Sequence, residues 1–507
     1  MTKSTDLLSA FRAEKNLRKN KLKRADIPPF CDFSTEENFM KNRMIKSMSL
    51  LLIFIFTLSV APITVSAASD FKIESGVLLE YTGSAKNVTI PSEVYKIADE
   101  AFYGNTSIQS VDLNKTSVVG NDAFRNCTYL STVTGYDNVS SCGAYAFLGT
   151  PFFANYTSTD LVMGNVLVGS KAKGSYIVPT SVKSIAPYAL SGNKDITSVT
   201  IGNGVASVGE GAFYNCSNLS SVTVSAQVSY IGPLAFEGTK FLSSNTKEFL
   251  VLGNGILVKY SGTAATVNVP DTVKQIGAGA FYQNTKITTI NIPATVSGIG
   301  MRAFSGCTSL KAVTFPENIV LIDKEAFAGC TAIAELTIPE SVSVIGESAF
   351  FGCSGLTTVK YMTDADISRG MFASCSKLKS VMIAAKPENV GELAFYNCPA
   401  LEEMSIPESV KSLGSNVFKN SKKISVWCDS SAFAYTNLSS RGVKVCQIGD
   451  ANLDGVVNIK DATHIQKYTA GLSTMSFSAM LRSDIDFNAA LNVRDATWIQ
   501  KKVAGIV

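Results

Sequence analysis

From residue 70 to residue 427 the hydrophobic positions of the chain recur with a fixed period. One phrase returns at a nearly constant spacing: an aliphatic–polar alternation, a proline, a second short aliphatic stretch, and Ala-Phe followed three positions later by Cys or Asn. The Phe (or Leu) of this phrase stands at Phe102, Phe124, Phe147, Leu190, Phe213, Phe236, Phe281, Phe304, Phe327, Phe350, Phe372, Phe395 and Phe418. Such fixed self-similarity predicts a solenoid, in which each unit buries its apolar face only against its neighbours.

Each unit is predicted to form one turn of a coil. In residues 310–315, apolar and polar side chains alternate, which is typical of a short half-buried strand. Pro316 ends that strand because proline has no N–H to donate to a continuing ladder. A second apolar stretch, 319–322, then leads to Ala326 and Phe327, where Ala permits close approach and Phe fills the core.

Two of the spacings between the repeated positions are nearly double the others, so each conceals a divergent unit. The interruptions at 150–179 and 239–270 resemble each other. Each ends in two strand-like runs around a Gly/Ser turn, which predicts hairpins over 166–176 and 256–267. Segment 69–91 has the same shape and suits an N-terminal cap. Aromatic residues of the interruptions are expected to pack these hairpins, with a sugar contact as the alternative: Phe152, Phe153, Tyr156, Phe241, Phe249 and Tyr260.

The thirteen matched positions and the phrase around them resemble the BspA-type leucine-rich repeat, over about residues 70–427. The resemblance implies a leucine-rich-repeat β-solenoid, right-handed, with parallel strands from short units of about 22–23 residues. It also implies a secreted or surface-exposed bacterial protein.

The cysteines of the repeats are predicted to be structural. Seven stand three residues after the repeat Phe, where other units carry Asn or Thr: Cys127, Cys216, Cys307, Cys330, Cys353, Cys375 and Cys398. Small residues in register point to a buried turn position, where the S–H group serves the backbone. Cys428 and Cys446 flank the end of the array, and the sequence leaves open whether they form a disulfide.

No catalytic site is visible in the repeats. The single histidine, His464, lies outside them, which removes Ser-His-Asp, Cys-His and His-based zinc chemistry from the solenoid. The acids of the repeats are expected to be exposed surface charges: Glu335, Glu340, Glu402, Glu403 and Glu408. The outward strand positions carry Thr, Ser and mixed charge with few aromatics, which favours a protein ligand over a polysaccharide.

The basic balance of the whole chain, 45 Lys+Arg against 41 Asp+Glu, comes from its first 46 residues, which hold eleven basic and six acidic side chains. The remainder is almost neutral, which argues against nucleic-acid binding. From Met44, a positive Lys46, an apolar run over 50–60 and the small residues of 65–67 predict a signal peptide, with a signal anchor as the alternative. Residues 1–43 are then a mis-called extension. The mature chain is predicted to begin near Ala68, to lack a membrane span and to be secreted.

The last sixty residues carry two loops of another kind. The first places oxygen-bearing groups at the spacing of a calcium-binding loop: Asp450, Asn452, Asp454, the carbonyl of Val456, Asn458 and Asp461. The second repeats the spacing with Asp484, Asp486, Asn488, the carbonyl of Ala490, Asn492 and Asp495. Gly455 supplies the sharp turn of the first loop. Ala489 replaces it in the second, where Asn488 is also neutral, so the second Ca²⁺ is expected to bind more weakly. An Asp/Asn-rich surface turn is the alternative.

Both loops end in Asp where an EF-hand has Glu, and neither is predicted to be entered by a helix. The duplicated loop–helix of residues 447–507 resembles a type I dockerin module. The resemblance implies a small α-helical domain around two Ca²⁺ ions that binds a cohesin module of a scaffoldin in a cellulosome-type complex. Positions that carry partner choice in that family correspond here to Ile459, Lys460, Gln466, Lys467, Val493, Arg494, Gln500 and Lys501. The near-identity of the two halves suggests that either helix can face the cohesin.

The predicted plan is an extension (1–43), a signal peptide (44–67), the solenoid (68–427), a cap or linker (428–446) and the dockerin-like module (447–507). The expected function is a secreted, non-catalytic binding or adhesion protein, anchored to a scaffoldin through calcium. Two alternatives remain at this point. One is a hydrolase or accessory protein in polysaccharide degradation, and the other is a calcium sensor that opens a groove.

Overall fold

The structure is a computed structural model that describes residues 70–421 and 423–506. The predicted extension and signal peptide lie outside these residues. The described residues belong to one compact unit, Ser69–Val507. Within them, no helix combines the length and the apolar character needed to cross a lipid bilayer.

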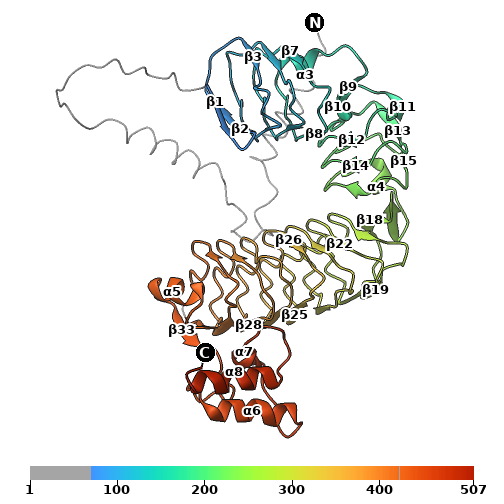
Figure 1. Cartoon of the computed structure of the whole chain (residues 1–507). Coiled ribbons are helices and arrows are strands. Elements are labelled where there is room, and N and C mark those ends of the chain that lie inside the picture. The colour runs from blue at the N-terminus through green and yellow to red at the C-terminus, as the bar shows by residue number, and fades with distance from the viewer. Residues whose placement is uncertain (1–69, 422, 507) are drawn as a thin grey trace, which may run out of the picture. The chain divides into compact units, whose positions relative to one another are not determined.

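Most coils of the array contribute two short strands, and within each sheet a strand pairs in parallel with its equivalent in the next coil (Figure 1). In the first ladder, which precedes the Ala-Phe turn, β24 (Leu321–Ile322) lies between β22 (Gly298–Ile299) and β26 (Val344–Ile345). In the second ladder, which precedes the proline, β21 (Thr289–Asn291) pairs with β23 (Ala312–Val313). Leu321 thus faces Gly298 and Val344, its equivalents in the two adjoining units, so the sequence period is the register of the sheets.

The remaining strands of the first ladder have two residues each: β4 (Lys96–Ile97), β6 (Val118–Val119), β8 (Ser141–Cys142), β12 (Ser184–Ile185), β14 (Ser207–Val208), β16 (Tyr230–Ile231), β20 (Gln275–Ile276), β29 (Asn389–Val390) and β31 (Ser412–Leu413). Those of the second ladder are longer: β3 (Asn87–Thr89), β5 (Ser110–Asp112), β7 (Thr132–Thr134), β11 (Gly174–Ile177), β13 (Ile196–Ile201), β15 (Ser221–Val224), β19 (Thr266–Asn268), β25 (Glu335–Ile338), β27 (Thr358–Tyr361), β28 (Ser380–Ile383), β30 (Glu403–Ser405), β32 (Ser425–Cys428) and β33 (Lys444–Gln447).

Three antiparallel hairpins start three blocks of the array: β1 (Phe71–Glu74) with β2 (Val77–Tyr81), β9 (Asp160–Met163) with β10 (Val166–Ser170), and β17 (Phe249–Leu252) with β18 (Ile256–Tyr260). The hairpins predicted over 166–176 and 256–267 are therefore wrong by one strand. The run after the Gly/Ser turn joins the second ladder instead, because β11 and β19 pair in parallel with β13 and β21. The two runs around each Gly/Ser turn therefore belong to different sheets, because these coils contribute one strand to each ladder.

The repeat phenylalanines stack in columns through the core. Phe281, Phe304, Phe327 and Phe350 follow one another with ring centroids 4.8, 5.0 and 5.4 Å apart and almost parallel planes. All four are buried. Their burial confirms the predicted core role of these side chains. The stacking of the rings adds to the stabilisation that burial alone provides.

The repeat cysteines satisfy the backbone of the preceding coil, as predicted. Each Sγ donates to the carbonyl oxygen of the Phe or Leu one coil earlier, at 3.0 to 3.4 Å. Burial raises the pKa of Cys353 to about 12, so this thiol stays protonated and inert. The thiols of Cys428 and Cys446 are both free, which answers the question that the sequence left open.

The helices lie at the interruptions and beyond the last coil. α3 (Pro151–Asn155) and α4 (Lys240–Ser243) stand at the start of the two interruptions, where the side chains of Thr150 and Thr239 cap them. α5 (Phe433–Ser440) precedes β33, which extends the last sheet by pairing with β32. The C-terminal module contains α6 (Ile459–Thr469), α7 (Phe477–Ser483) and α8 (Val493–Val503) (Figure 1).

Candidate metal centre

Each of the two loops leads into its helix through the same hydrogen bonds. The side chain of Asn458 caps α6 by accepting from the N–H of Lys460 at 2.8 Å, and Asp461 accepts from the N–H of Asn458 at 2.8 Å. Asn492 and Asp495 repeat both bonds at α8, at 2.8 and 2.9 Å. The Asp at the twelfth position thus serves as a capping-box acceptor, which explains why a short Asp suits this place.

The first carboxylate of each loop holds the turn that follows it. Asp450 accepts from the N–H of Gly455 at 3.2 Å, and Asp484 accepts from the N–H of Ala489 at 2.8 Å. Gly455 and Ala489 both have positive φ angles, 85° and 64°. The glycine adopts this conformation without steric cost, whereas the alanine is strained by its Cβ.

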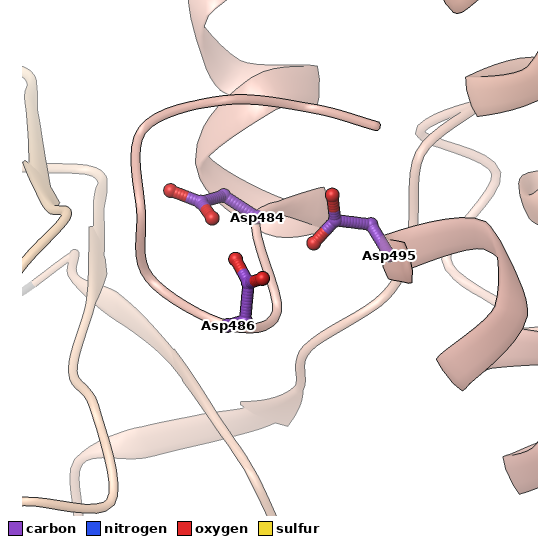
Figure 2. A group of neighbouring side chains, drawn as sticks. All are labelled: Asp484, Asp486 and Asp495. Carbon is purple, nitrogen blue, oxygen red and sulfur yellow. The ribbon is translucent and has the colours of Figure 1, made fainter. Parts of the chain in front are cut away.

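Three carboxylates converge in the second loop, from Asp484, Asp486 and Asp495 (Figure 2). One oxygen from each lies within 4.8 Å of the others. Burial is the largest cause that raises the pKa of Asp484 to about 7, and the charges of Asp495 and Asp486 add to it. Burial also raises the pKa of Asp495. A site with crowded, partly desolvated carboxylates is complementary to a hard divalent cation.

In the first loop, a different observation indicates a cation site. Asp450 is 0% exposed, and its Oδ1 has no hydrogen-bond partner among the described residues. A buried carboxylate oxygen without a donor is costly unless a cation satisfies it. Within residues 70–421 and 423–506, the compact three-carboxylate group is found in the second loop alone, although the sequence favoured the first.

The structure places the remaining predicted ligands around these loops. Asp461 and Asp495 are buried, Asn452, Asn458 and Asn492 are half-buried, and Asp454 and Asn488 are exposed. The carbonyls predicted as ligands accept from side-chain amides, Val456 from Asn458 at 3.1 Å and Ala490 from Asn492 at 2.9 Å.

The two predicted partner-binding rows lie on the outer sides of α6 and α8. The helices pack against each other around a small core of Ala462, Ile465, Ala496 and Ile499. The row on α6 is exposed throughout: Ile459, Lys460, Gln466 and Lys467. On α8, Val493, Arg494 and Lys501 are exposed and Gln500 is half-buried. His464 and Trp498 are both half-buried.

Arg482, which the sequence did not single out, connects the first loop to the solenoid. Its guanidinium donates to Asp450 Oδ2 at 3.0 Å and to Glu403 Oε2 of β30 at 3.2 Å. It also lies 4.2 Å from the ring centroid of Trp427. Ser478 of α7 donates to the same Glu403 oxygen at 2.7 Å. Asp450 is therefore shared between the loop and a contact with the solenoid.

Two sequence expectations are wrong at this contact. Glu403, predicted to be an exposed surface charge, is 7% exposed, because Arg482 and Ser478 supply donors from more than seventy residues away. The second loop, predicted to lack an entering helix, follows α7, which ends at Ser483 directly before Asp484. A helix of seven residues with Gly-free, mixed composition left little periodic signal.

Replacing Arg482 with alanine is expected to loosen the C-terminal module from the solenoid. The change leaves Glu403 and Asp450 as buried carboxylates without their cation, at a cost of about 3–5 kcal/mol. Hydrogen exchange of the α7 amides and thermal unfolding measure the effect. Arg369→Ala is the matched control, because its pair with Glu392 is exposed at 3.5 Å and worth less than about 1 kcal/mol. Equal, small shifts for both variants would contradict the coupling.

Calcium affinity of the second loop is expected to rise as the pH rises through about 7. Since the folded, metal-free loop raises the pKa of Asp484 above its ordinary value of 3.8, this group favours the metal-free fold most below 3.8 and loses that contribution as the pH approaches about 7. A cation needs the ionised carboxylate, so binding below that pH releases a proton. Titration calorimetry in buffers of different ionisation enthalpy measures the release, and Asp484→Asn should abolish it. A pH-independent affinity would exclude this assignment.

Comparison with known protein families identifies the same repeats. The family described as BspA type Leucine rich repeat region matches in six copies, over residues 72–161, 170–253, 258–366, 308–425 and 362–466. No curated protein matches the sequence.

Several solved structures are similar in part. A leucine rich cell surface protein from Faecalibacterium prausnitzii A2-165 is 22% identical over 72% of this chain and 94% of its own, with a TM-score of 0.27. A leucine-rich repeat protein from Bacteroides ovatus ATCC 8483 is 21% identical over 78% and 100%, with a TM-score of 0.32. One from Bacteroides capillosus ATCC 29799 is 31% identical over 22% and 90%, with a TM-score of 0.20. Since the family match spans most of the chain and the coils carry its period, this chain belongs to the BspA-type leucine-rich repeat family.

Proposed function

We propose that this protein is a secreted, non-catalytic binding protein whose solenoid recognises a partner and whose residues 447–507 attach it, with two bound Ca²⁺ ions, to a cohesin module of a scaffoldin. The second ladder of the solenoid carries exposed Thr and Ser side chains, and the thiols of the repeat cysteines are buried. Export is part of the proposal and is supported by the signal-like segment 44–67.

The observation that carries the attachment role is the duplicated loop–helix geometry. Both loops end in the same Asn/Asp capping box, and the two helices pack directly against each other. The buried, unpartnered oxygen of Asp450 and the three crowded carboxylates of the second loop supply the chemistry for a hard cation. The ions would be held by the neighbouring Asn side chains and carbonyls together with Asp450, Asp454, Asp461, Asp484, Asp486 and Asp495.

Exposed apolar side chains at the two helix starts support a protein partner. Ile459 is 52% exposed and Val493 is 63% exposed, and each is followed by a basic residue, Lys460 or Arg494. Apolar anchors flanked by charge are typical of protein interfaces. Because the two halves present equivalent rows, the module offers a cohesin two alternative faces.

The test is capture of the chain by immobilised type I cohesin modules, with calcium and with EDTA. We expect calcium-dependent capture. Ile459→Asp with Lys460→Asp should leave binding through α8, and Val493→Asp with Arg494→Asp should leave binding through α6, whereas the combined variant should lose it. Absence of capture by every cohesin tested, and by the surface extract of the producing bacterium, would reject the attachment role.

A further inference from the structure

The turns that carry the repeat Phe form a third set of contacts between coils. In each turn that is followed by another coil of the same block, three N–H groups donate to carbonyls of that next coil. In the coil of Phe213, the donors are Gly211, Phe213 and Asn215, and the acceptors are the carbonyls of residues 233, 235 and 237, each at 2.8 Å. These bonds repeat along each block and close the turn side of the solenoid.

At the start of the third block this set of bonds is interrupted. Among residues 70–421 and 423–506, the equivalent N–H groups of Leu234, Phe236 and Gly238 have no hydrogen-bond acceptor. On the other side of the interruption, the carbonyl of Ala280 accepts from the N–H of Tyr260 at 2.9 Å. The N-terminal hairpin makes the same bond to its first coil, from the N–H of Tyr81 to the carbonyl of Ala101. The flanking carbonyls of Ala278 and Tyr282 accept from no group in the described part of the chain.

A cleft of about 730 Å³ lies between these two turns and is also lined by Leu242 of α4 and by Ile256, Val258, Lys259 and Tyr260 of β18. Its floor contains buried Phe236 and Ala280, and exposed Leu234 and Tyr282 stand at its rim. The volume falls within the range of about 300–1,000 Å³ that is usual for ligand sites.

The first interruption of the array shows that this cleft is not a necessary result of a hairpin insertion. There, Tyr145 and Tyr188 occupy the positions equivalent to Leu234 and Gly279, and their rings stack at 4.5 Å. Tyr188 also donates to Glu210 at 2.8 Å. All four residues have φ angles between 55° and 65°, so they share the left-handed backbone conformation and differ in their side chains. Two tyrosines fill the first interruption, whereas leucine and glycine leave the second open.

We propose that this cleft binds a peptide segment of a partner protein that adopts the conformation of a coil turn and lies parallel to the turns. The carbonyls of the peptide accept from the N–H groups of Leu234, Phe236 and Gly238, and its own N–H groups donate to the carbonyls of Ala278 and Tyr282. One wall offers donors and the other offers acceptors, which matches a main chain in the conformation of the coil turns, whose alternate N–H groups point to the next coil and whose alternate carbonyls point to the preceding one. Main-chain hydrogen bonds of this kind give affinity in strand-addition complexes, and the rim side chains select sequence.

The proposal names the site and the ligand class of the binding role proposed for the solenoid and rests on that role, but it does not depend on the calcium module. A free main-chain donor beside an apolar floor gains more from a peptide carbonyl than an exposed donor does, because water competes less there.

The test uses the full chain from residue 68 and a library of N-acetylated, C-amidated octapeptides of random sequence. Selected peptides are expected to protect the amides of Leu234, Phe236 and Gly238 from hydrogen exchange, and backbone N-methylation of the same peptides should abolish binding. Leu234→Tyr with Gly279→Tyr reproduces the stacked pair of the first interruption and should weaken binding at least about tenfold. Ser348→Tyr adds a tyrosine at the equivalent turn position of an uninterrupted coil and should leave binding unchanged. Unaltered thermal unfolding confirms that the variants fold.

Three outcomes would overturn the cleft proposal. Binding of cello- or xylo-oligosaccharides in place of peptides, with protection of the same amides, would assign the cleft to a glycan. Peptide binding that the double tyrosine variant leaves intact would place the partner elsewhere on the solenoid and keep the proposed binding role. Failure of every peptide to bind below about 1 mM, with cohesin capture intact, would reject the cleft without affecting the attachment role.

Discussion

Chelation of calcium is expected to unfold residues 447–507 while the repeat array stays folded. The module has a small core of its own, formed by Ala451 and four residues of α6 and α8. Its loops hold buried or crowded carboxylates that repel one another without a cation. An ion that binds only the folded form stabilises it by about 4 kcal/mol when its free concentration is about 1,000 times the Kd. A module with so small a core depends on that contribution.

Far-ultraviolet circular dichroism of the chain from residue 68, recorded with calcium and with EDTA, measures the effect. The helical signal of α6 and α8 should fall on chelation, and the thermal transition of the array should remain. Asp484→Asn is expected to reproduce part of the loss at saturating calcium, and Asp271→Asn, an exposed acid of the solenoid, serves as the control. A helical signal that ignores EDTA would show that the module folds without metal.

The period of the sequence predicted the coils because each repeated residue has one local task. Phe327 must fill the space between the rings before and after it, and Cys330 must satisfy a carbonyl of the preceding coil. These requirements recur once in every unit and leave a pattern that needs no knowledge of distant contacts. The same locality made the first ladder, the proline stop and the structural thiols predictable.

Features that depend on distant residues were missed. Glu403 has the composition of a surface strand residue, and its partner Arg482 stands 79 residues later in a different kind of structure. The hairpins of the interruptions were assigned one strand too late because the strand-like runs are equally apolar, and only the pairing of β11 with β13 and of β19 with β21 decides between them. The alternation of apolar and polar residues within a strand does not show which other strand it pairs with.

The loops of the candidate metal centre were predictable from the sequence, and calcium binding by their residues stays a prediction. The alternate Asp and Asn residues marked the loops, and the structure brings Asp484, Asp486 and Asp495 together as that spacing requires. The relative strength of the two loops was not predictable, because the sequence weighs Gly455 against Ala489 but cannot show that Arg482 competes for Asp450. Calcium binding by the first loop is therefore expected to depend on the contact of Arg482 with Asp450 as well as on the loop itself.

Phe327→Ala is expected to lower the free energy of unfolding of the third block by about 3–5 kcal/mol. The ring is fully buried and stacked on both sides, by Phe304 at 5.0 Å and Phe350 at 5.4 Å. Its removal takes away two ring contacts and leaves a cavity that two packed neighbours prevent from collapsing. Urea unfolding, followed by circular dichroism with calcium present, measures the change.

Phe418→Ala provides the comparison within the same column. Phe418 is half-buried and stacks on Phe395 at 5.8 Å, with no further repeat ring in the described structure beyond it, so its loss is expected to cost clearly less. In a solenoid, stability is a sum of unit terms and interfaces between neighbours, so a central substitution weakens two interfaces and a terminal one weakens one. Phe327→Ala should therefore also broaden the transition, since the coils on its two sides lose their coupling and unfold at different urea concentrations. Equal costs for the two variants would mean that the interfaces are not the unit of stability and that the array unfolds as a single globular core.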